Sequence, residues 1–236
     1  MIHTFRRALA ALALVLLAGP LFAAGTVQLV LEGQVHLDGG RRVEFQAEAG
    51  GRSVAWRTQF ANGTSAGDVM AYLARRLKGA GIGHYRGVEK ASGQPQVLFI
   101  ENVERISVRF GGGLTAVLHS MDEVPTGFTV EPPRRRVDVG SATVELYVTF
   151  EEARTGEWSS VTVAAEMGSA SSSAIIASAL HDSALARRLV SDKPTTTSWA
   201  VSGNQSGDRA VAMTARLYGY ADWGLVMDFQ PLVEDR

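Results

Sequence analysis

The sequence contains no cysteine among its 236 residues. This absence excludes disulfide scaffolds, zinc and iron–sulfur sites built on cysteine, and enzymes with a cysteine nucleophile. An excess of one charge is also missing, because 23 Lys and Arg residues stand against 24 Asp and Glu residues. A chain so close to neutrality lacks the basic balance of a nucleic-acid-binding protein, and we expect no nucleic acid among its partners.

Metal and cofactor motifs are scarce as well. Gly111-Gly112-Gly113 follows one predicted strand and precedes another, so it lacks the helix N-terminus that holds a phosphate group. His181-Asp182 lies in a predicted helix without a further ligand three or four residues away. We therefore expect neither a metal nor a cofactor.

One long apolar run is present, from Ala8 to Phe22, and no later segment approaches the length of a membrane-spanning helix. Arg6 and Arg7 precede this run, and the small residues Ala23 to Gly25 follow it. This is the pattern of a secretory signal peptide, and we interpret residues 1–25 as one. The sequence thus predicts an exported protein, periplasmic or extracellular, whose mature chain has no transmembrane span.

Alternating apolar and polar residues predict strands over most of the remaining chain. A segment of helical period begins near Asp68, with Ser65 or Thr64 placed to cap its start and Gly79 or Gly81 its end. A second helix is predicted from Ser173 to Leu189, with Pro194 as a breaker after it. The predicted strands lie around residues 27–31, 43–49, 54–58, 97–100, 106–110, 114–118, 144–150, 161–165, 199–201, 211–217 and 225–229.

The order of these elements repeats along the chain, and both helices carry the pentapeptide Leu-Ala-Arg-Arg-Leu, at residues 73–77 and 185–189. We predict an α+β fold of two similar units, each a mainly antiparallel sheet with one helix packed on it, in the order strand-strand-helix-strand-strand. The units are residues 26–131 and 141–236, a possible tandem duplication. Residues 132–140, with two prolines and three arginines, read as the linker.

A possible catalytic motif lies between a predicted strand and the first helix. Gly63-Thr64-Ser65-Ala66-Gly67 matches G-x-S-x-G, the sequence of a nucleophile elbow. It resembles the GTSAG of patatin-like lipases, and Leu29 to Gly33 resembles the strand that opens that family. The resemblance covers about ten residues, and it implies a serine hydrolase with Ser65 as nucleophile. Gln34, Val35 and His36 stand where that family has the glycine run of its oxyanion hole.

The second half of the chain offers a comparison for this motif. Its counterpart, Gly168-Ser169-Ala170-Ser171-Ser172, keeps the hydroxyl groups that cap a helix and loses the G-x-S-x-G pattern. We therefore favour a capping role for Ser65. An esterase- or lipase-like hydrolase that uses Ser65 stays as the alternative.

Aromatic residues gather near the C-terminus, where Tyr218, Tyr220 and Trp223 are our candidate binding residues. No supported catalytic set accompanies them. The sequence thus favours a secreted or periplasmic, non-catalytic binding or assembly module of the cell envelope or extracellular space, with a protein or a glycan as partner.

Overall fold

The computed structural model describes residues 24–35, 42–87, 96–111, 113–133, 142–168, 170–218 and 222–230. Over these residues the chain is mostly strand, with helices α2 (Ala66–Ala80) and α3 (Ser173–Ala186). The strands are β1 (Gly25–Gly33), β2 (Arg42–Ala49), β3 (Arg52–Gln59), β4 (His84–Gly87), β5 (Gln96–Phe110), β6 (Leu114–Ser120), β7 (Gly127–Glu131), β8 (Ala142–Glu151), β9 (Trp158–Met167), β10 (Leu189–Thr195), β11 (Ser198–Asn204), β12 (Arg209–Tyr218) and β13 (Gly224–Asp228).

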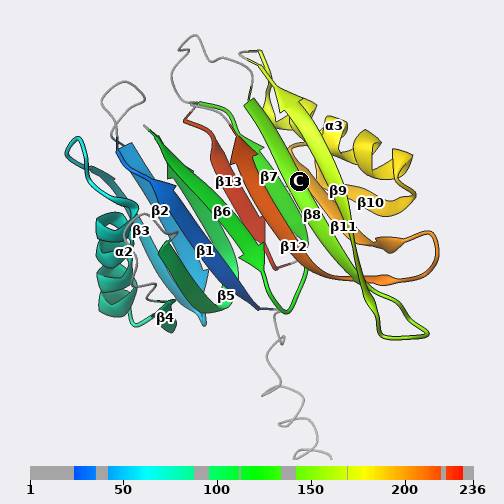
Figure 1. Ribbon diagram of the computed structural model, residues 1–236, viewed down its shortest axis with the longest axis horizontal. Coiled ribbons are helices and arrows are strands. Elements are labelled where there is room, and N and C mark those ends of the chain that lie inside the picture. The colour runs from blue at the N-terminus through cyan, green and yellow to red at the C-terminus, as the bar shows by residue number, and fades with distance from the viewer. Residues whose placement is uncertain are drawn as a thin grey trace, which may run out of the picture.

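A single antiparallel sheet holds all thirteen strands. Its order is β10-β11-β7-β13-β5-β1-β6-β12-β8-β9, while β2 and β4 also pair with β5, and β3 pairs with β2. A further pairing of β11 with β12 closes seven of the strands into a barrel. Helices α2 and α3 lie at opposite ends of the molecule, with the strands between them (Figure 1). Neither helix is long and apolar enough to cross a membrane, within the residues described.

The prediction of an α+β fold with two units of sheet plus helix is wrong. The protein is mainly β, and β6 of the first half pairs with β12 of the second, as β13 of the second pairs with β5 of the first. The buried apolar side chains of both halves form one cluster. Periodicity shows which face of a strand is buried but not which strand lies beside it, so the sequence did not reveal the shared sheet.

The pairings of β1 to β6 nevertheless recur among β7 to β13, so the boundary between the repeated sets lies before β7, within the predicted first unit. β2 pairs with β3 and with the C-terminal part of β5, as β8 pairs with β9 and with β12. β1 pairs with β6 and with the N-terminal part of β5, as β7 pairs with β13 and with β11. With β4 on β5 matching β10 on β11, each strand from β1 to β6 has a counterpart among β7 to β13, and the tandem duplication stays a prediction.

The shared pentapeptide does not occupy equivalent places. Residues 73–77 lie inside α2, whereas residues 185–189 run from the end of α3 into β10. Arg188 has a φ of 60°, a left-handed conformation that ends the helical path before Leu189. The second helix is therefore shorter than predicted, and Pro194 lies within β10 rather than in a break. Proline is tolerated there because β10 is an edge strand, paired with β11 alone among the strands that the structure describes.

Local signals at the first helix are confirmed. Ser65 is the N-cap of α2, and Gly81, with a φ of 69°, is its left-handed C-cap. The helix buries Val69, Met70, Leu73 and Leu77 against the sheet. The predicted signal peptide lies almost wholly outside the described residues, as does most of the predicted linker.

Candidate functional site

Ser65 occupies the first turn of α2 in a capping geometry. Its Oγ accepts a hydrogen bond from the backbone N–H of Asp68 at 3.2 Å and donates one to Asp68 Oδ2 at 2.8 Å. The imidazoles of His84, His119 and His181, the described histidines, each contact a different hydrogen-bond partner. Among the described residues, Ser65 is therefore tied to its own helix.

Replacing Ser65 with alanine should lower the free energy of unfolding by about 1 kcal/mol, because the amide of Asp68 loses its side-chain acceptor. Chemical denaturation of the full chain measures this loss. Ser65→Asn is the matched control, since asparagine also caps helices and should keep stability close to that of the parent protein. Equal losses in both variants would contradict the capping role.

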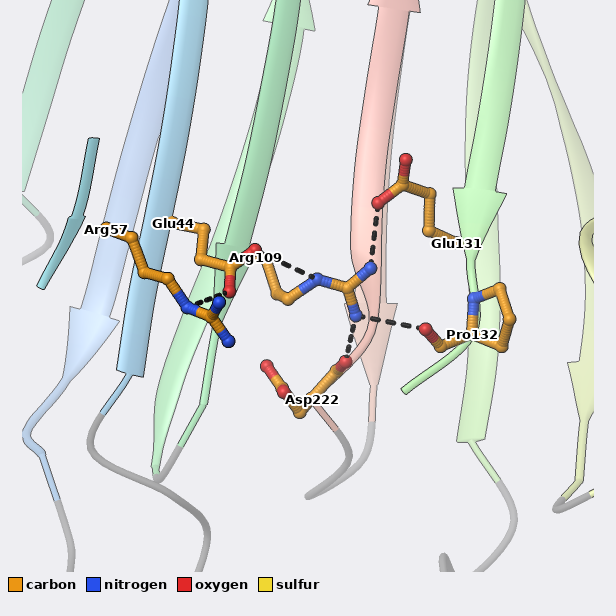
Figure 2. A network of polar contacts seen from close by, with 6 residues as sticks. All are labelled: Glu44, Arg57, Arg109, Glu131, Pro132 and Asp222. Carbon is orange, nitrogen blue, oxygen red and sulfur yellow. Dashed lines mark hydrogen bonds and ion pairs between the residues drawn. The ribbon is translucent and has the colours of Figure 1, made fainter. Parts of the chain in front are cut away.

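A buried arginine organises the outer face of β2, β5 and β13. Arg109 of β5 is 4% exposed, and its register places Glu44 of β2 on one side and Gly224 of β13 on the other. Arg57 of β3 lies opposite Glu44. Figure 2 shows the guanidinium of Arg109 between Glu44 and Glu131. We call Glu44, Arg57, Arg109, Glu131, Pro132 and Asp222 the Arg109 network.

The Arg109 guanidinium connects three segments of chain. It donates to Glu131 Oε2 at 2.7 Å, to the Pro132 carbonyl at 3.1 Å and to the Asp222 carbonyl (Figure 2). A Cβ atom at Gly224 would lie 3.0 Å from its Nη2 atom, so glycine leaves room for these contacts. The residues that follow β7 are thereby held against the residues that precede β13.

Glu44 lies within reach of two arginines. Its carboxylate is 2.7 Å from Arg57 Nε and 3.9 Å from Arg109 Nε. A groove of about 360 Å³ lies beside these side chains, and its lining includes Gln46 and Ser107. Because the hydrogen bonds of Arg109 run to the protein's own carbonyl and carboxylate oxygens, we assign this network a structural role.

A corresponding arrangement of an arginine opposite a glutamate lies on β8 and β12, where the neighbouring side chains are exposed to solvent. Arg216 of β12 lies opposite Glu145 of β8, as Arg109 lies opposite Glu44. Val117 of β6 stands beside Arg216, where Gly224 stands beside Arg109. We call Glu32, Glu145, Tyr147, Arg216 and Tyr218 the tyrosine cluster.

Both tyrosines of this cluster are exposed, Tyr147 by 36% and Tyr218 by 38%. The guanidinium of Arg216 lies 4.9 Å from the ring centroid of Tyr218, and its Nη2 is 3.7 Å from Glu32 Oε2. The hydroxyl of Tyr147 donates to Glu145 Oε2 at 2.6 Å. This bond, with a smaller contribution from the hydroxyl of Tyr218, raises the pKa of Tyr147 to about 12. Tyr147 thus keeps its hydroxyl proton at physiological pH.

The three binding residues predicted from the sequence do not lie together in one exposed site. Tyr218 lies in the tyrosine cluster, Trp223 is 2% exposed and packs in the core, and Tyr220 lies outside the described residues. Sequence analysis missed Arg216 and Tyr147. Strand alternation puts Arg216 on the same face as Tyr218, but only the pairing of β12 with β8 brings Tyr147 beside them.

Asp228 is the second buried charge on the outer face. Its Oδ1 atom lies 2.9 Å from Nη1 of Arg105, and the side chain is 8% exposed. Burial raises the pKa of Asp228 above its ordinary 3.8, while Arg105 opposes the shift and Glu48 adds to it. The folded state therefore binds this proton more tightly than the unfolded state does. Its contribution to stability is present below pH 3.8 and is lost as pH rises through the folded-state pKa.

Replacing Asp228 with asparagine should remove that dependence on pH. Relative to the parent protein, Asp228→Asn should gain stability as pH rises from about 3 to about 7, because the parent alone must ionise a buried carboxyl group. Loss of the pair with half-exposed Arg105 should cost less than about 1 kcal/mol. Urea unfolding at several pH values measures the difference. The exposed Asp182→Asn is the control, and a difference for Asp228→Asn that does not change with pH contradicts the expectation.

No group of three or more His, Asp or Glu residues that could hold a metal ion occurs in the described part of the chain.

Comparison with known proteins adds little to this picture. No family model matches the chain, and no curated protein matches it. A solved structure, the flagellar cap protein FliD from Helicobacter pylori, aligns with 84% of this chain and 57% of its own chain, at 10% identity and a TM-score of 0.22. A TM-score of this size carries no argument about fold or function, so the functional argument rests on the residues themselves.

Proposed function

We propose that this protein is a non-catalytic binding module that recognises its partner through the tyrosine cluster. The pattern of residues 1–25 supports a place in the cell envelope or the extracellular space. The observation that carries the proposal is the pair of exposed tyrosines, Tyr147 and Tyr218, beside Arg216, whose buried Nε atom has no hydrogen-bond partner among the described residues.

Physical chemistry supports such a use of this surface. A tyrosine ring offers a large contact area and loses little conformational entropy when it is bound, because it has only two side-chain torsions. Tyrosine and arginine are also the residues that most often dominate binding energy. Tyr147 and Tyr218 project from β8 and β12, so paired strands hold the two rings in place.

Co-sedimentation with isolated cell envelopes tests the binding role. The full chain should sediment with the envelopes, and the double variant Tyr147→Ala/Tyr218→Ala should stay in solution. Tyr85→Ala is the matched control, because Tyr85 is an exposed tyrosine on β4, several strands away in the sheet. Equal sedimentation of the double variant and the parent protein would contradict the proposal.

A fluorophosphonate probe tests the non-catalytic part. We expect no labelling of the purified chain, since Ser65 Oγ bonds to Asp68 within its own helix. Labelling that disappears in Ser65→Ala and persists in Ser172→Ala, the N-cap variant of α3, would overturn it in favour of the serine hydrolase.

A further inference from the structure

The two arginine positions differ in what surrounds the guanidinium. At Arg109, two backbone carbonyl oxygens and one carboxylate accept its hydrogen bonds. At Arg216, the carboxylate of Glu32 lies at 3.7 Å, and Arg216 Nε is buried without a hydrogen-bond partner. Among the described residues, a carboxylate lies near the Arg216 guanidinium, but no backbone carbonyl accepts a hydrogen bond from it.

The net charge of the tyrosine cluster limits the chemical class of ligand that can bind there. The tyrosine cluster holds two carboxylates, Glu32 and Glu145, and one guanidinium. A further anion would meet this net negative charge and would be repelled. A cation would compete with Arg216, which already lies over the ring of Tyr218. A neutral ligand avoids both costs.

The hydrogen-bond donors and acceptors of the tyrosine cluster limit the class of ligand further. Arg216 can only donate hydrogen bonds, while the carboxylates of Glu32 and Glu145 can only accept them. A hydroxyl group does both, so a ligand with several hydroxyl groups can bond to all three side chains. The exposed rings of Tyr147 and Tyr218 require in addition an apolar face that can lie against them.

From this geometry we propose that the tyrosine cluster binds a neutral glycan. The apolar face of a sugar ring lies on an exposed tyrosine, sugar oxygens accept hydrogen bonds from Arg216, and sugar hydroxyls donate to Glu145. Because both tyrosines lie on an open strand surface, the site suits several units of a chain better than one enclosed sugar. This inference rests on the proposed function and names the partner class for the same site.

Isothermal titration of the full chain tests the glycan. The probes are neutral oligosaccharides of glucose and of N-acetylglucosamine, an oligogalacturonate as the anionic sugar, and a neutral and an acidic peptide. We expect at least one neutral oligosaccharide to bind with a Kd between about 1 μM and 1 mM, and the oligogalacturonate to bind at least about tenfold more weakly.

Variants locate the site. Tyr218→Ala should weaken binding by about tenfold or more. Arg216→Lys should also weaken binding, because an ammonium group lacks the planar set of N–H donors of a guanidinium. Tyr218→Phe keeps the ring and should bind nearly as the parent does, as should Tyr85→Ala. Thermal unfolding of each variant shows that loss of binding is not loss of folding.

Three results would overturn the glycan assignment: no neutral oligosaccharide binds, the anionic sugar binds best, or Tyr218→Ala and Tyr85→Ala behave alike. Peptide binding lost in Tyr218→Ala, without any sugar binding, would replace the glycan by a protein partner and leave the binding module standing. Labelling of Ser65 by the fluorophosphonate probe would instead remove the proposed function itself, so the two failures can be told apart.

Discussion

Replacing Arg109 with alanine is expected to lower the free energy of unfolding by about 3 kcal/mol or more. The side chain is nearly fully buried, and it donates to the Pro132 and Asp222 carbonyls as well as to Glu131 (Figure 2). Alanine would leave these acceptors without their donor and would leave a cavity on the outer face. Chemical denaturation of the full chain measures the loss.

Arg57→Ala is the matched control for this experiment. Arg57 pairs with Glu44 in the same network, but its side chain is 45% exposed, so its removal should cost less than about 1 kcal/mol. Arg109→Lys should fall between the two, because an ammonium group cannot span the same acceptors as a guanidinium. Similar losses for Arg57→Ala and Arg109→Ala would show that Arg109 does not hold the network together.

The second large effect is expected at the seam between β11 and β7, two neighbouring strands of the barrel. Trp199 of β11 is fully buried and lies opposite Phe128 of β7, and among the described residues this is the one pair in register between the two strands. Its Nε1 donates to Ser191 Oγ at 2.7 Å. Because one backbone pair contributes little, side-chain packing must hold this seam. Trp199→Ala should cost about 3–5 kcal/mol.

Trp158→Ala is the matched control for Trp199→Ala, because both variants replace a tryptophan with alanine. Trp158 begins the edge strand β9 and is 73% exposed, so its loss should change the free energy of unfolding by less than about 0.5 kcal/mol. Thermal and urea unfolding of both variants measure the difference. If the two tryptophan variants lose the same stability, the seam is not held by Trp199.

The barrel explains why both expected effects are large although neither residue lies in the candidate binding site. Arg109 fastens the segments that follow β7 and precede β13, and Trp199 joins β11 to β7. Both therefore act where chain segments distant in sequence meet. The tyrosine cluster, by contrast, has exposed tyrosines on β8 and β12, so these two side chains can be changed with less effect on packing.

Local signals were predictable because they depend on neighbours in the sequence. The Ser65 cap, the Gly81 terminus of α2 and the alternation in β2 needed only a few adjacent residues. One error in the predicted strands lies at a residue with an unusual backbone angle. Asn102 has a φ of 53° and lies between two predicted strands, which continue as the single strand β5.

Part of the candidate site could be predicted in the same way. The aromatic residues near the C-terminus include Tyr218. Alternation along β12 places Arg216 on the same face of the strand as Tyr218. The sequence could not separate Tyr218 from Trp223, since Trp223 is buried beside residues distant in the sequence, such as Val108 of β5 and Leu114 of β6, which line the same small cavity. Nor could it bring in Tyr147 and Glu145, which come from β8.

By itself, the sequence determined the lack of disulfides, the positions of most strands, the start of both helices and the aromatic residues available for binding. Only the tertiary structure decided that the two halves share one sheet, that Arg109 is enclosed while Arg216 is open, and that two tyrosines meet beside it. The reason is physical. Propensity, capping and alternation act between residues a few positions apart, whereas strand pairing joins residues far apart in the chain and is selected by the packing of the whole core.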